Sequence, residues 1–483
     1  MANFIGIDLG TTYSLLSSFS EDGSNEIKYD RERFLPSVVY FGDTIAVGET
    51  ALQALEIDSE NVVLQIKKKM PQNNTYELNF NGIKYSPEDI SSLILRKLIV
   101  DAETKIGKVD YATITTPAFY NDIAREATKK AALKAGIENV SIISEPVAAG
   151  LYYSRTKKIN GKVLVYDLGG GTLDCSIIDI DGDKVEVQGS RGDSFGGTDF
   201  DSKLFDLINL EYKKNKGTDV SNNLANFKKT LQLRIEGYKK TLDFESSIKA
   251  VIPGDSGQAN ISINASDFKE SLEEYIVKSE MILESLLDEL ELSIEKIDEI
   301  VLVGGSTRMP LFQDHLKDFF KKNELVSTVN VDEVVCLGAS IHCSITNSEK
   351  LNSIQNEAVG GIKLSNVVNH FYGTISLDDN HQLMNSVMIK KNEKFPIEIS
   401  RTFYTVSGSD SLNCRVTQSE IETIDLEPQE VISESTLNDL GQNREAGEPI
   451  EITFAIDNDQ ILICTFKDPK TGKNIILEKN LRK

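Results

Sequence analysis

The 483-residue sequence has little cysteine, no apolar run of membrane-spanning length and no recognisable leader. Its five cysteines form no C-x-x-C pair and lie mostly in apolar, strand-like surroundings, where a thiol packs as a small hydrophobic group. The start, MANFIGIDLG, leads almost directly into a predicted strand, without a basic segment or a cleavable apolar stretch. We therefore expect a soluble, unexported protein of the reducing cytoplasm that has no membrane partner.

Two common nucleotide-binding motifs are also missing. No G-x-x-x-x-G-K-[ST] segment occurs, which disfavours a P-loop NTPase, and no G-x-G-x-x-G follows a strand, which disfavours a dinucleotide site. Positive charge is scarce, because 75 acidic residues outnumber 52 lysines and arginines and leave a net charge of −23. We expect no nucleic-acid partner, and any bound anion must be held by a local site.

The length predicts two to four domains. Three apolar runs rich in β-branched residues are predicted strands that each end in a glycine turn, at residues 4–7, 162–166 and 300–303. After the first two turns the chain continues as a strand, whereas Pro310 opens a predicted helix after the third. The order strand, Asp-Leu-Gly, Thr, strand recurs after about 160 residues. This weak repeat predicts two related α/β halves that face one cleft, with chance repetition as the alternative.

The rest of the chain divides by its pattern. A largely helical insert is predicted at residues 224–243 and 266–292, split by a strand pair at 248–252 and 259–263. A polar stretch with Gly360 and Gly361 is typical of a linker, so we assign residues 1–345 to the α/β domain and 346–366 to the linker. Short strands separated by turn residues, including Asp457-Asn458-Asp459, then predict an all-β sandwich at 367–483.

The first two glycine turns can bind phosphate. Glycines allow backbone N–H groups to approach a phosphate closely, and they occur at Gly10, Gly169, Gly170 and Gly171. Hydroxyl donors are available from Thr11, Thr12 and Thr172, while Asp8 and Asp167 can hold Mg²⁺ through its retained waters. Either motif alone is equally consistent with an ordinary tight turn. Together they predict a phosphate-binding site that differs from a P-loop.

The third turn runs from Gly304 and Gly305 through Ser306 to Arg308. Its donors at a helix N-terminus suit a ribose, an adenine face or phosphate oxygens, and the Arg308 guanidinium can stack on a base. Ordinary strand-to-helix packing is the alternative.

Several segments resemble one family: IGIDLGTTYS, ITTPAFYND, IISEPVAAGLYY, VYDLGGGTLD and VLVGGSTRMP are similar to the seventy-kilodalton heat-shock chaperones of the DnaK type. The resemblance covers essentially the whole chain, because IEITFAIDNDQILI is similar to the family's peptide-binding sandwich. It implies an actin-like ATPase domain of the duplicated, ribonuclease H-like kind, followed by an all-β sandwich domain. ATP or ADP and Mg²⁺ are the implied ligands, with K⁺ as a further candidate ion.

The resemblance also implies residue roles in transferring the γ-phosphate to water. Lys67 matches the lysine that orients this water, and Glu145 and Asp174 match acids near the water and Mg²⁺. Thr172 matches a phosphate-binding hydroxyl in the same reaction. Such chemistry needs positioning and charge stabilisation rather than a covalent intermediate. Without the resemblance, Lys67 would be interpreted as part of a solvated run of lysines.

Further matches concern the nucleotide, the coupling of domains and the peptide. The implied nucleotide contacts include Tyr13, Gly196, Gly197, Glu236, Lys239, Arg308 and Asp332. Pro117 and Arg125 match a pair that relays the nucleotide state to the peptide domain. The implied peptide pocket includes Phe403, Val406 and Leu412, although apolar sandwich core is an equally good interpretation of these residues.

The sequence departs from the family at several points. The linker segment GIKLSNVV is interrupted by Lys363 and Ser365, which puts allosteric coupling in doubt. Asp243, Thr198 and Gln460 replace a base-contacting serine, a glutamate and a turn glycine. The family's helical lid has no counterpart before the last residue, so we expect captured peptide to leave quickly.

Three functions therefore stay open. The first is an ATP-dependent chaperone for extended apolar segments of unfolded polypeptides, with a J-domain cochaperone and a nucleotide-exchange factor as partners. The second is a nucleotide-switched binding or regulatory protein of the same fold with weak client cycling. The third is a small-molecule kinase or a filament-forming actin relative, which the β-rich tail disfavours.

Overall fold

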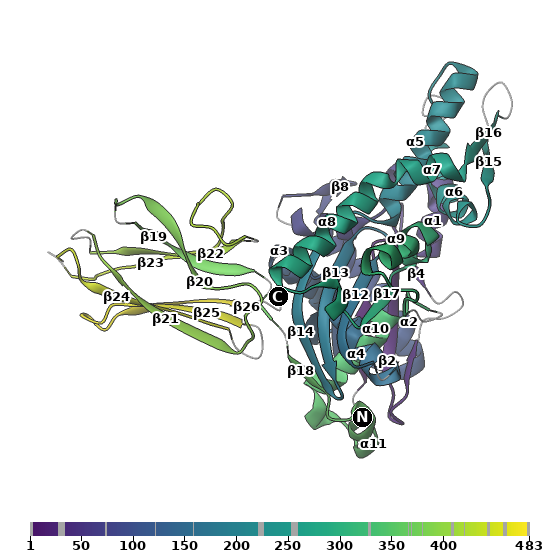
Figure 1. Ribbon diagram of the computed structural model, residues 1–483. Coiled ribbons are helices and arrows are strands. Elements are labelled where there is room, and N and C mark those ends of the chain that lie inside the picture. Colours follow the sequence, from purple (N-terminus) through teal and green to yellow (C-terminus); the bar gives the residue numbers. More distant parts are fainter. Residues whose placement is uncertain are drawn as a thin grey trace. The chain divides into compact units, whose positions relative to one another are not determined.

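The computed structural model describes residues 3–480 apart from gaps at 28–33, 73–74, 121, 158, 221–226, 253–258, 327–329, 366, 369, 379, 407–409, 420, 442–444 and 457–460. The chain forms two compact units, Met1–Val185 with Ser190–Lys363, and Glu186–Gly189 with Leu364–Lys483 (Figure 1). The predicted turn at residues 457–459 and Gln460 lie outside the described residues. No helix in the described part of the chain is long and apolar enough to cross a membrane.

The first unit contains a six-stranded sheet in the order β11-β10-β1-β2-β3, with β4 also paired to β2. Its strands are β1 (Phe4–Asp8), β2 (Tyr13–Phe19), β3 (Asn25–Ile27), β4 (Leu35–Pro36), β10 (Tyr111–Thr116) and β11 (Asn139–Ser144). The central strand β1 has β2 as an antiparallel hairpin partner on one side and β10 as a parallel neighbour on the other.

A second sheet repeats this arrangement, with five strands in the order β17-β12-β13-β14-β18, of which β17, β12 and β13 lie wholly in the first unit. These strands are β12 (Gly161–Leu168), β13 (Leu173–Asp181), β14 (Lys184–Asp193), β17 (Glu299–Val303) and β18 (Lys363–Ser365). Strand β12 again has an antiparallel hairpin partner, β13, and a parallel neighbour, β17. The Asp-Leu-Gly turn lies at the end of β1 in the first sheet and at the end of β12 in the second, and both strands have the same kinds of neighbour, which is the arrangement that the repeat predicts.

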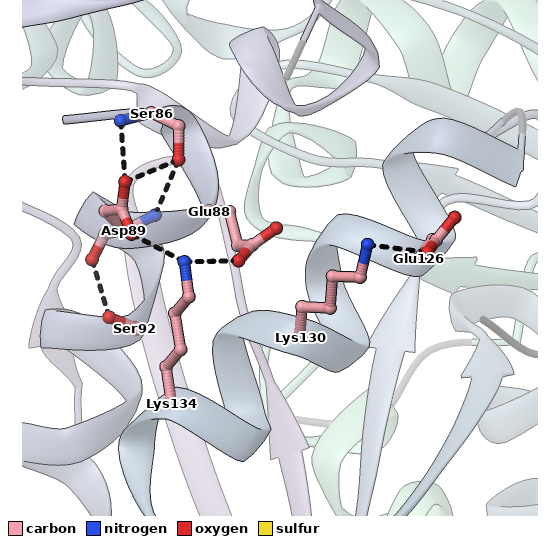
Figure 2. A network of polar contacts seen from close by, with 7 residues as sticks. All are labelled: Ser86, Glu88, Asp89, Ser92, Glu126, Lys130 and Lys134. Atoms are coloured by element: carbon pink, nitrogen blue, oxygen red, sulfur yellow. Dashed lines mark hydrogen bonds and ion pairs between the residues drawn. The ribbon is translucent and has the colours of Figure 1, made fainter. Parts of the chain in front are cut away.

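Helices α2 (Pro87–Ile106) and α3 (Asp122–Ala135) pack against each other and share a core with the first sheet. The start of α2 is fixed by a capping box, in which Ser86 Oγ accepts from Asp89 N at 3.2 Å and Asp89 Oδ2 accepts from Ser86 N at 2.9 Å. Figure 2 shows that Lys134, in the last turn of α3, reaches both Glu88 and Asp89 at this helix start, at 2.5 Å and 2.7 Å. The network therefore ties the two helices together at one end.

Helices α10 (Val334–Thr346) and α4 (Glu145–Lys157) pack closely, and α4 contacts strands of both sheets. The closeness depends on glycine. A Cβ on Gly6 of β1 would lie 2.2 Å from Ser340 N of α10, and a Cβ on Gly338 of α10 would lie 1.7 Å from the Ala148 carbonyl oxygen of α4. Real Cβ atoms cannot come this close to backbone, so these two glycines set the spacing between the sheet and the helices.

The predicted insert corresponds to α6 (Phe227–Leu242), β15 (Ser247–Ile252), β16 (Ala259–Asn264), α7 (Ala265–Ser271) and α8 (Glu273–Glu289), and α5 (Gly197–Lys216) precedes it. Helices α6 and α7 and the two strands lie at one end of the first unit (Figure 1). The segment predicted to be helical at 266–292 forms two helices, α7 and α8, which are separated by the fully buried Leu272. The other helices and strands of this unit are α1 (Glu49–Gln53), α9 (Pro310–Phe320), α11 (Ser353–Val359), β5 (Val39–Phe41), β6 (Ile45–Val47), β7 (Val62–Val63), β8 (Leu78–Phe80) and β9 (Ile83–Tyr85).

The polar stretch assigned to a linker, residues 346–366, is largely ordered secondary structure. Helix α11 starts with a capping box, in which Asn352 Oδ1 accepts from Gln355 N at 2.8 Å and Asn352 N donates to Gln355 Oε1 at 3.0 Å. The same two side chains donate to the backbone oxygens of Glu21 and Ser20. Polar residues typical of a linker here serve as a helix cap and as an anchor. Next along the chain, Lys363 N donates to Asp183 O at 2.8 Å.

The second unit consists of two antiparallel sheets, each of four strands, in the orders β20-β19-β22-β23 and β21-β24-β25-β26. The strands are β19 (Phe371–Leu377), β20 (Leu383–Ile389), β21 (Ile397–Tyr404), β22 (Leu412–Ser419), β23 (Glu430–Leu437), β24 (Pro449–Ile456), β25 (Ile461–Lys467) and β26 (Asn474–Asn480). Both sheets contribute to one apolar core that includes Val416, Phe454 and Phe466. Strands β19 and β23 escaped prediction, because polar residues and Gly373 interrupt their apolar alternation.

Replacing Gly338 by alanine should destabilise the first unit. The added methyl group overpacks α10 against α4, and we expect the free energy of unfolding to fall by about 2 kcal/mol. Gly237→Ala is the matched control, since Gly237 also lies in a helix but a Cβ there meets nothing within 4 Å. That substitution should raise the free energy of unfolding by about 0.5–1 kcal/mol. Urea unfolding followed by circular dichroism measures both, and equal midpoints for the two variants would contradict the packing argument.

Candidate functional site

The two Asp-Leu-Gly turns lie directly against each other. A Cβ on Gly170 would lie 2.4 Å from Thr12 Oγ1, and a Cβ on Gly171 would lie 2.7 Å from Thr11 Oγ1. Within the second turn, Gly169 N donates to Thr172 O at 3.0 Å. The turns were predicted separately from the sequence, and the fold brings their glycines and threonines into one place.

A buried ion pair lies beside these turns. Lys67 belongs to the 3-10 helix η3 (Ile66–Gln72) and Glu145 is the first residue of α4. Lys67 Nζ lies 2.5 Å from Glu145 Oε1, and both side chains are 8% exposed. The run of three lysines in the sequence suggests a solvated patch, but the side chain of Lys67 is deeply buried. Tyr120, donating its hydroxyl to Lys67 O at 2.8 Å, fixes the backbone of the lysine.

Three aspartates surround this pair. Asp8 is the last residue of β1 and Asp167 is the last but one of β12, and Asp174 faces Asp167 across the β12–β13 hairpin. Asp8 Oδ1 accepts from Thr115 Oγ1 at 3.2 Å, and Asp174 Oδ1 accepts from Ala118 N at 2.6 Å. Strand ends therefore place the carboxyl groups where the chain turns.

Burial dominates the electrostatics of the site. It raises the pKa of Asp8 to about 7 and the pKa of Asp174 to about 8, with Lys67 opposing both shifts and the Glu145 carboxylate adding to them. Burial likewise raises the pKa of Asp167 well above its ordinary value. Burial alone would lower the pKa of Lys67, but the carboxylates of Glu145 and Asp8 outweigh it and raise that pKa. The lysine stays charged at neutral pH, among carboxyl groups that favour a further cation.

The donor set fits Mg²⁺ held through water. Asp174 Oδ2 is buried and has no hydrogen-bond partner among the described residues. Within the same residues, no three His, Cys, Asp or Glu side chains converge to hold a metal ion directly. Mg²⁺ usually keeps several waters and binds one or two carboxylates together with phosphate oxygens. Asp8 and Asp167, next to the glycine turns, are placed for that kind of binding.

The start of α5 lies against the second glycine turn. Gly197 N donates to Gly169 O at 3.0 Å, and Thr198 N donates to Gly170 O at 2.7 Å. Ser306 Oγ, from the third glycine turn, donates to the same Gly169 O at 2.9 Å. All three glycine turns thus meet, although the sequence separates them by more than a hundred residues in each case.

Helix α6 and the third turn supply the remaining predicted contacts. Lys239 Nζ donates to Gly197 O at 2.9 Å and pairs with Asp201 at 2.8 Å. Glu236 Oε2 accepts from the Tyr13 hydroxyl at 3.5 Å, which links α6 to the first hairpin.

The half-exposed Arg308 pairs with Asp332 at 2.8 Å, and this contact orients its guanidinium plane. A Cβ on Gly305 would lie 2.9 Å from Asp332 Oδ1, so the turn approaches this acid closely. Gly304 has φ of 80°, a conformation that favours glycine. Asp243 and Thr198 are two of the residues at which the sequence departs from the family. Burial raises the pKa of Asp243 to about 6. Thr198 Oγ1 is buried without a hydrogen-bond partner among the described residues.

Pro117 and Arg125 lie next to the buried cluster. Arg125 donates from Nε to Tyr120 O at 3.1 Å and from Nη2 to Ala118 O at 3.0 Å. Tyr120 N donates to Pro117 O at 3.2 Å. Because Ala118 also holds Asp174, and Tyr120 also holds Lys67, this short segment joins Arg125 to two residues of the site.

Sequence reasoning missed Lys68, Asp199, Thr115 and Tyr120. Lys68 Nζ lies 2.8 Å from Asp199 Oδ2, next to the glycine turns. Asp199 carried little signal, because the residue three positions before it is Gly196, which has no side chain to complete a capping box. Lys68 carries no signal of its own within a run of lysines. Thr115 and Tyr120 act through a hydrogen bond to a residue distant in sequence, which no local pattern indicates.

The residues predicted to bind peptide lie in the second unit. Phe403 and Leu412 are partly buried against its core, with Phe403 paired to Ile450 and Leu412 to Leu437 in register. Val406 is 46% exposed. Two of the three residues thus have contacts typical of sandwich core, and their role in peptide binding stays a prediction.

Comparison with known proteins gives a consistent result. The family model described as Hsp70 protein matches residues 4–480. The chaperone protein DnaK of Thermosipho melanesiensis is 34% identical over 494 residues, which cover 97% of this chain and 78% of that protein. DnaK of Thermosipho africanus is 35% identical with the same coverage. DnaK of Thermotoga neapolitana is 34% identical over 495 residues, 97% of this chain and 79% of that protein.

The raised pKa values predict how stability changes with pH in the absence of metal. The folded chain keeps protons on Asp8 and Asp174 that the unfolded chain releases near pH 3.8. Their contribution to stability is therefore full below about pH 4 and is lost as pH rises through about 7 to 8. In EDTA, the thermal midpoint should fall more steeply between about pH 4 and about pH 7 for wild type than for Asp8→Asn.

The control for this titration is Asp181→Asn, because Asp181 is exposed and lies away from the site on β13. It should follow the wild-type curve. If Asp8→Asn has the wild-type slope as well, the surroundings of Asp8 do not raise its pKa as described.

Proposed function

The chain belongs to the Hsp70 family, and from this premise we propose that it is an ATP-dependent molecular chaperone. In this proposal, the first unit binds ATP with Mg²⁺ and hydrolyses it to ADP and phosphate. The second unit binds extended apolar segments of unfolded polypeptides. The observation that carries the ATPase half is the meeting of two glycine turns beside the buried Lys67–Glu145 pair.

The fold proposed for the first unit is the duplicated, actin-like kind. Its support is the matching pattern of the two sheets, in which β1 and β12 each have a hairpin partner on one side and a parallel strand on the other. In such an arrangement β1 and β12 would both end at the same cleft. The proposed domain limits are residues 1–345, 346–366 and 367–483.

Phosphate is the ligand that the turns suit best. Backbone N–H groups of Gly10, Gly170 and Gly171, with the hydroxyls of Thr11, Thr12 and Thr172, would hold the phosphate oxygens, while Gly169 closes the turn by donating to Thr172 O. Mg²⁺, held through water by Asp8 and Asp167, would neutralise charge on those oxygens. Lys67 keeps its proton because its raised pKa lies far above neutrality, so it can position the attacking water and stabilise developing negative charge.

Glu145 and Asp174 complete the reactive end. Glu145 fixes the ammonium group of Lys67 in one place, and so limits where the water can lie. Asp174 is held at Oδ1 by Ala118 N, which leaves Oδ2 to accept a hydrogen bond from that water. No covalent enzyme intermediate is needed in this scheme.

The outer wall would bind the nucleoside. Lys239 and Glu236 on α6 are placed for ribose or base contacts, and Arg308, oriented by Asp332, offers a flat cation for stacking on adenine. Gly196, Gly197, Gly304, Gly305 and Ser306 would let the backbone approach the ligand closely. Tyr13, bonded to Glu236, would close this side.

The chaperone half rests on family membership and on relatives named as chaperone protein DnaK. Paired antiparallel sheets can bind an extended peptide through backbone hydrogen bonds and a side-chain pocket. We propose Phe403, Val406 and Leu412 near that pocket, and Pro117 and Arg125 in its coupling to nucleotide. A J-domain cochaperone, a nucleotide-exchange factor and a cytoplasmic location belong to the same proposal.

ATP turnover of wild type and Lys67→Ala, each with and without an apolar heptapeptide, tests both halves together. We expect the substitution to lower kcat at least about a hundredfold, because it removes the cation that faces the reaction. Peptide should accelerate wild-type turnover. A wild type that hydrolyses ATP but ignores every peptide would favour the second reading, a nucleotide-switched regulatory protein whose linker is altered at Lys363 and Ser365.

Lys69→Ala is the matched control for this experiment. Lys69 lies in the same η3 helix, but its Nζ lies 5.3 Å from the Tyr76 ring centroid and not in the site. It should retain wild-type turnover. Removing Lys67 leaves Glu145 without its partner, so ADP binding and circular dichroism of the variant must show that it is folded. A folded Lys67→Ala protein with normal turnover would contradict the role assigned to Lys67.

A further inference from the structure

Two adjacent lysines of η3, Lys67 and Lys68, form ion pairs with different acidic residues. Lys67 is buried and pairs with Glu145, whereas Lys68 Nζ lies 2.8 Å from Asp199 Oδ2. The Lys68 and Asp199 side chains are only 18% and 29% exposed, so water screens this pair less than a surface ion pair. The contact joins residues 131 positions apart.

Asp199 is also held by a contact that does not involve Lys68. It is the third residue of α5, and its Oδ2 accepts from Gly196 N at 2.9 Å. Gly197, which directly follows Gly196, donates its N–H to Gly169 O of the second hairpin at 3.0 Å. Lys68 is therefore tied to the backbone segment that holds one of the phosphate-binding turns.

The Lys68 stem itself lies across that turn. A Cβ on Gly171 would lie 2.8 Å from Lys68 Cε. Helix η3 packs with the first sheet, since Ile66 belongs to the core of β1, α2 and α3. Helix α5 packs with the second sheet, since Phe200 and Leu204 belong to the core of β12, β13 and β17. The ion pair thus connects the two halves of the first unit at their phosphate-binding end.

We propose that Lys68 and Asp199 are a positioning pair that holds the two halves closed over the phosphates and slows the release of ADP. The inference rests on the proposed function. A nucleotide held between two apposed hairpins leaves only when they separate, and separation breaks this ion pair. Loss of either charge lowers the cost of opening and should accelerate ADP release about fivefold, the size of effect typical of one partly screened pair.

Stopped-flow release of N-methylanthraniloyl-ADP into excess ADP and Mg²⁺ tests the pair. We compare wild type, Lys68→Gln, Asp199→Asn and the double variant. Both single variants should release the nucleotide about fivefold faster, and the double variant should be no faster than either, because all three lack the same contact. Added salt should accelerate wild-type release and leave the variants nearly unchanged. Lys68→Arg, which keeps the positive charge, should release the nucleotide as slowly as wild type.

The variants separate this role from simpler ones. Asparagine at position 199 still accepts from Gly196 N, so the cap of α5 is kept, and a cap effect alone would leave Lys68→Gln at the wild-type rate. Lys69→Gln removes a charge from the same η3 helix without touching Asp199 and should also release ADP at the wild-type rate. Circular dichroism compares the folding of all variants.

Three results would overturn the pair. If Lys68 instead binds phosphate directly, Asp199→Asn frees it and slows release while Lys68→Gln accelerates release, and such opposite signs contradict the closure role. Wild-type rates in both single variants contradict it as well, while leaving the ATPase proposal intact. A folded wild type that binds no labelled ADP contradicts the proposed function itself, and the pair with it.

Discussion

The buried contact between Lys67 and Glu145 is the interaction on which the candidate site depends. Charges removed from water are costly unless they are paired and hydrogen-bonded, and here one lysine faces a glutamate and three aspartates. The neighbouring carboxylates keep the lysine charged, and burial raises the pKa values of the aspartates, so the site is complementary to a cation accompanied by phosphate. The same burial explains why Thr115, Ala118 and Tyr120 all donate hydrogen bonds into this small volume.

Close backbone approach makes that burial possible. Gly6 and Gly338 bring the first sheet, α10 and α4 together, and α4 presents Glu145 from its first turn. Gly170 and Gly171 then let the two hairpins meet over the acids. The packing of the unit and the chemistry of its site are therefore set by the same constraint, which is that a methyl group at these glycines has no room.

Much of this arrangement was predictable where local pattern decides structure. β-branched runs ending in Asp-Leu-Gly predict the central strands, and their recurrence predicts two similar sheets. Contacts between distant segments were not predictable in this way. Lys68 is one lysine in a run, and only the fold brings Asp199 to it. Residues 353–359 look like linker because polar side chains also serve as caps, as Asn352 does for α11. Strand β23 has four exposed residues among its eight and contains two glutamates, two serines and a threonine, so no regular apolar alternation marks it.

Isothermal titration of the full chain with ADP, in Mg²⁺ and then in EDTA, tests the central claim that the glycine turns and buried acids form one Mg²⁺-nucleotide site. The account predicts binding of one ADP per chain, with an affinity at least about tenfold higher in Mg²⁺, since a divalent ion bridging phosphate and carboxylates contributes more than about 1.4 kcal/mol. Equal affinity with and without Mg²⁺, or no binding at all, would contradict it.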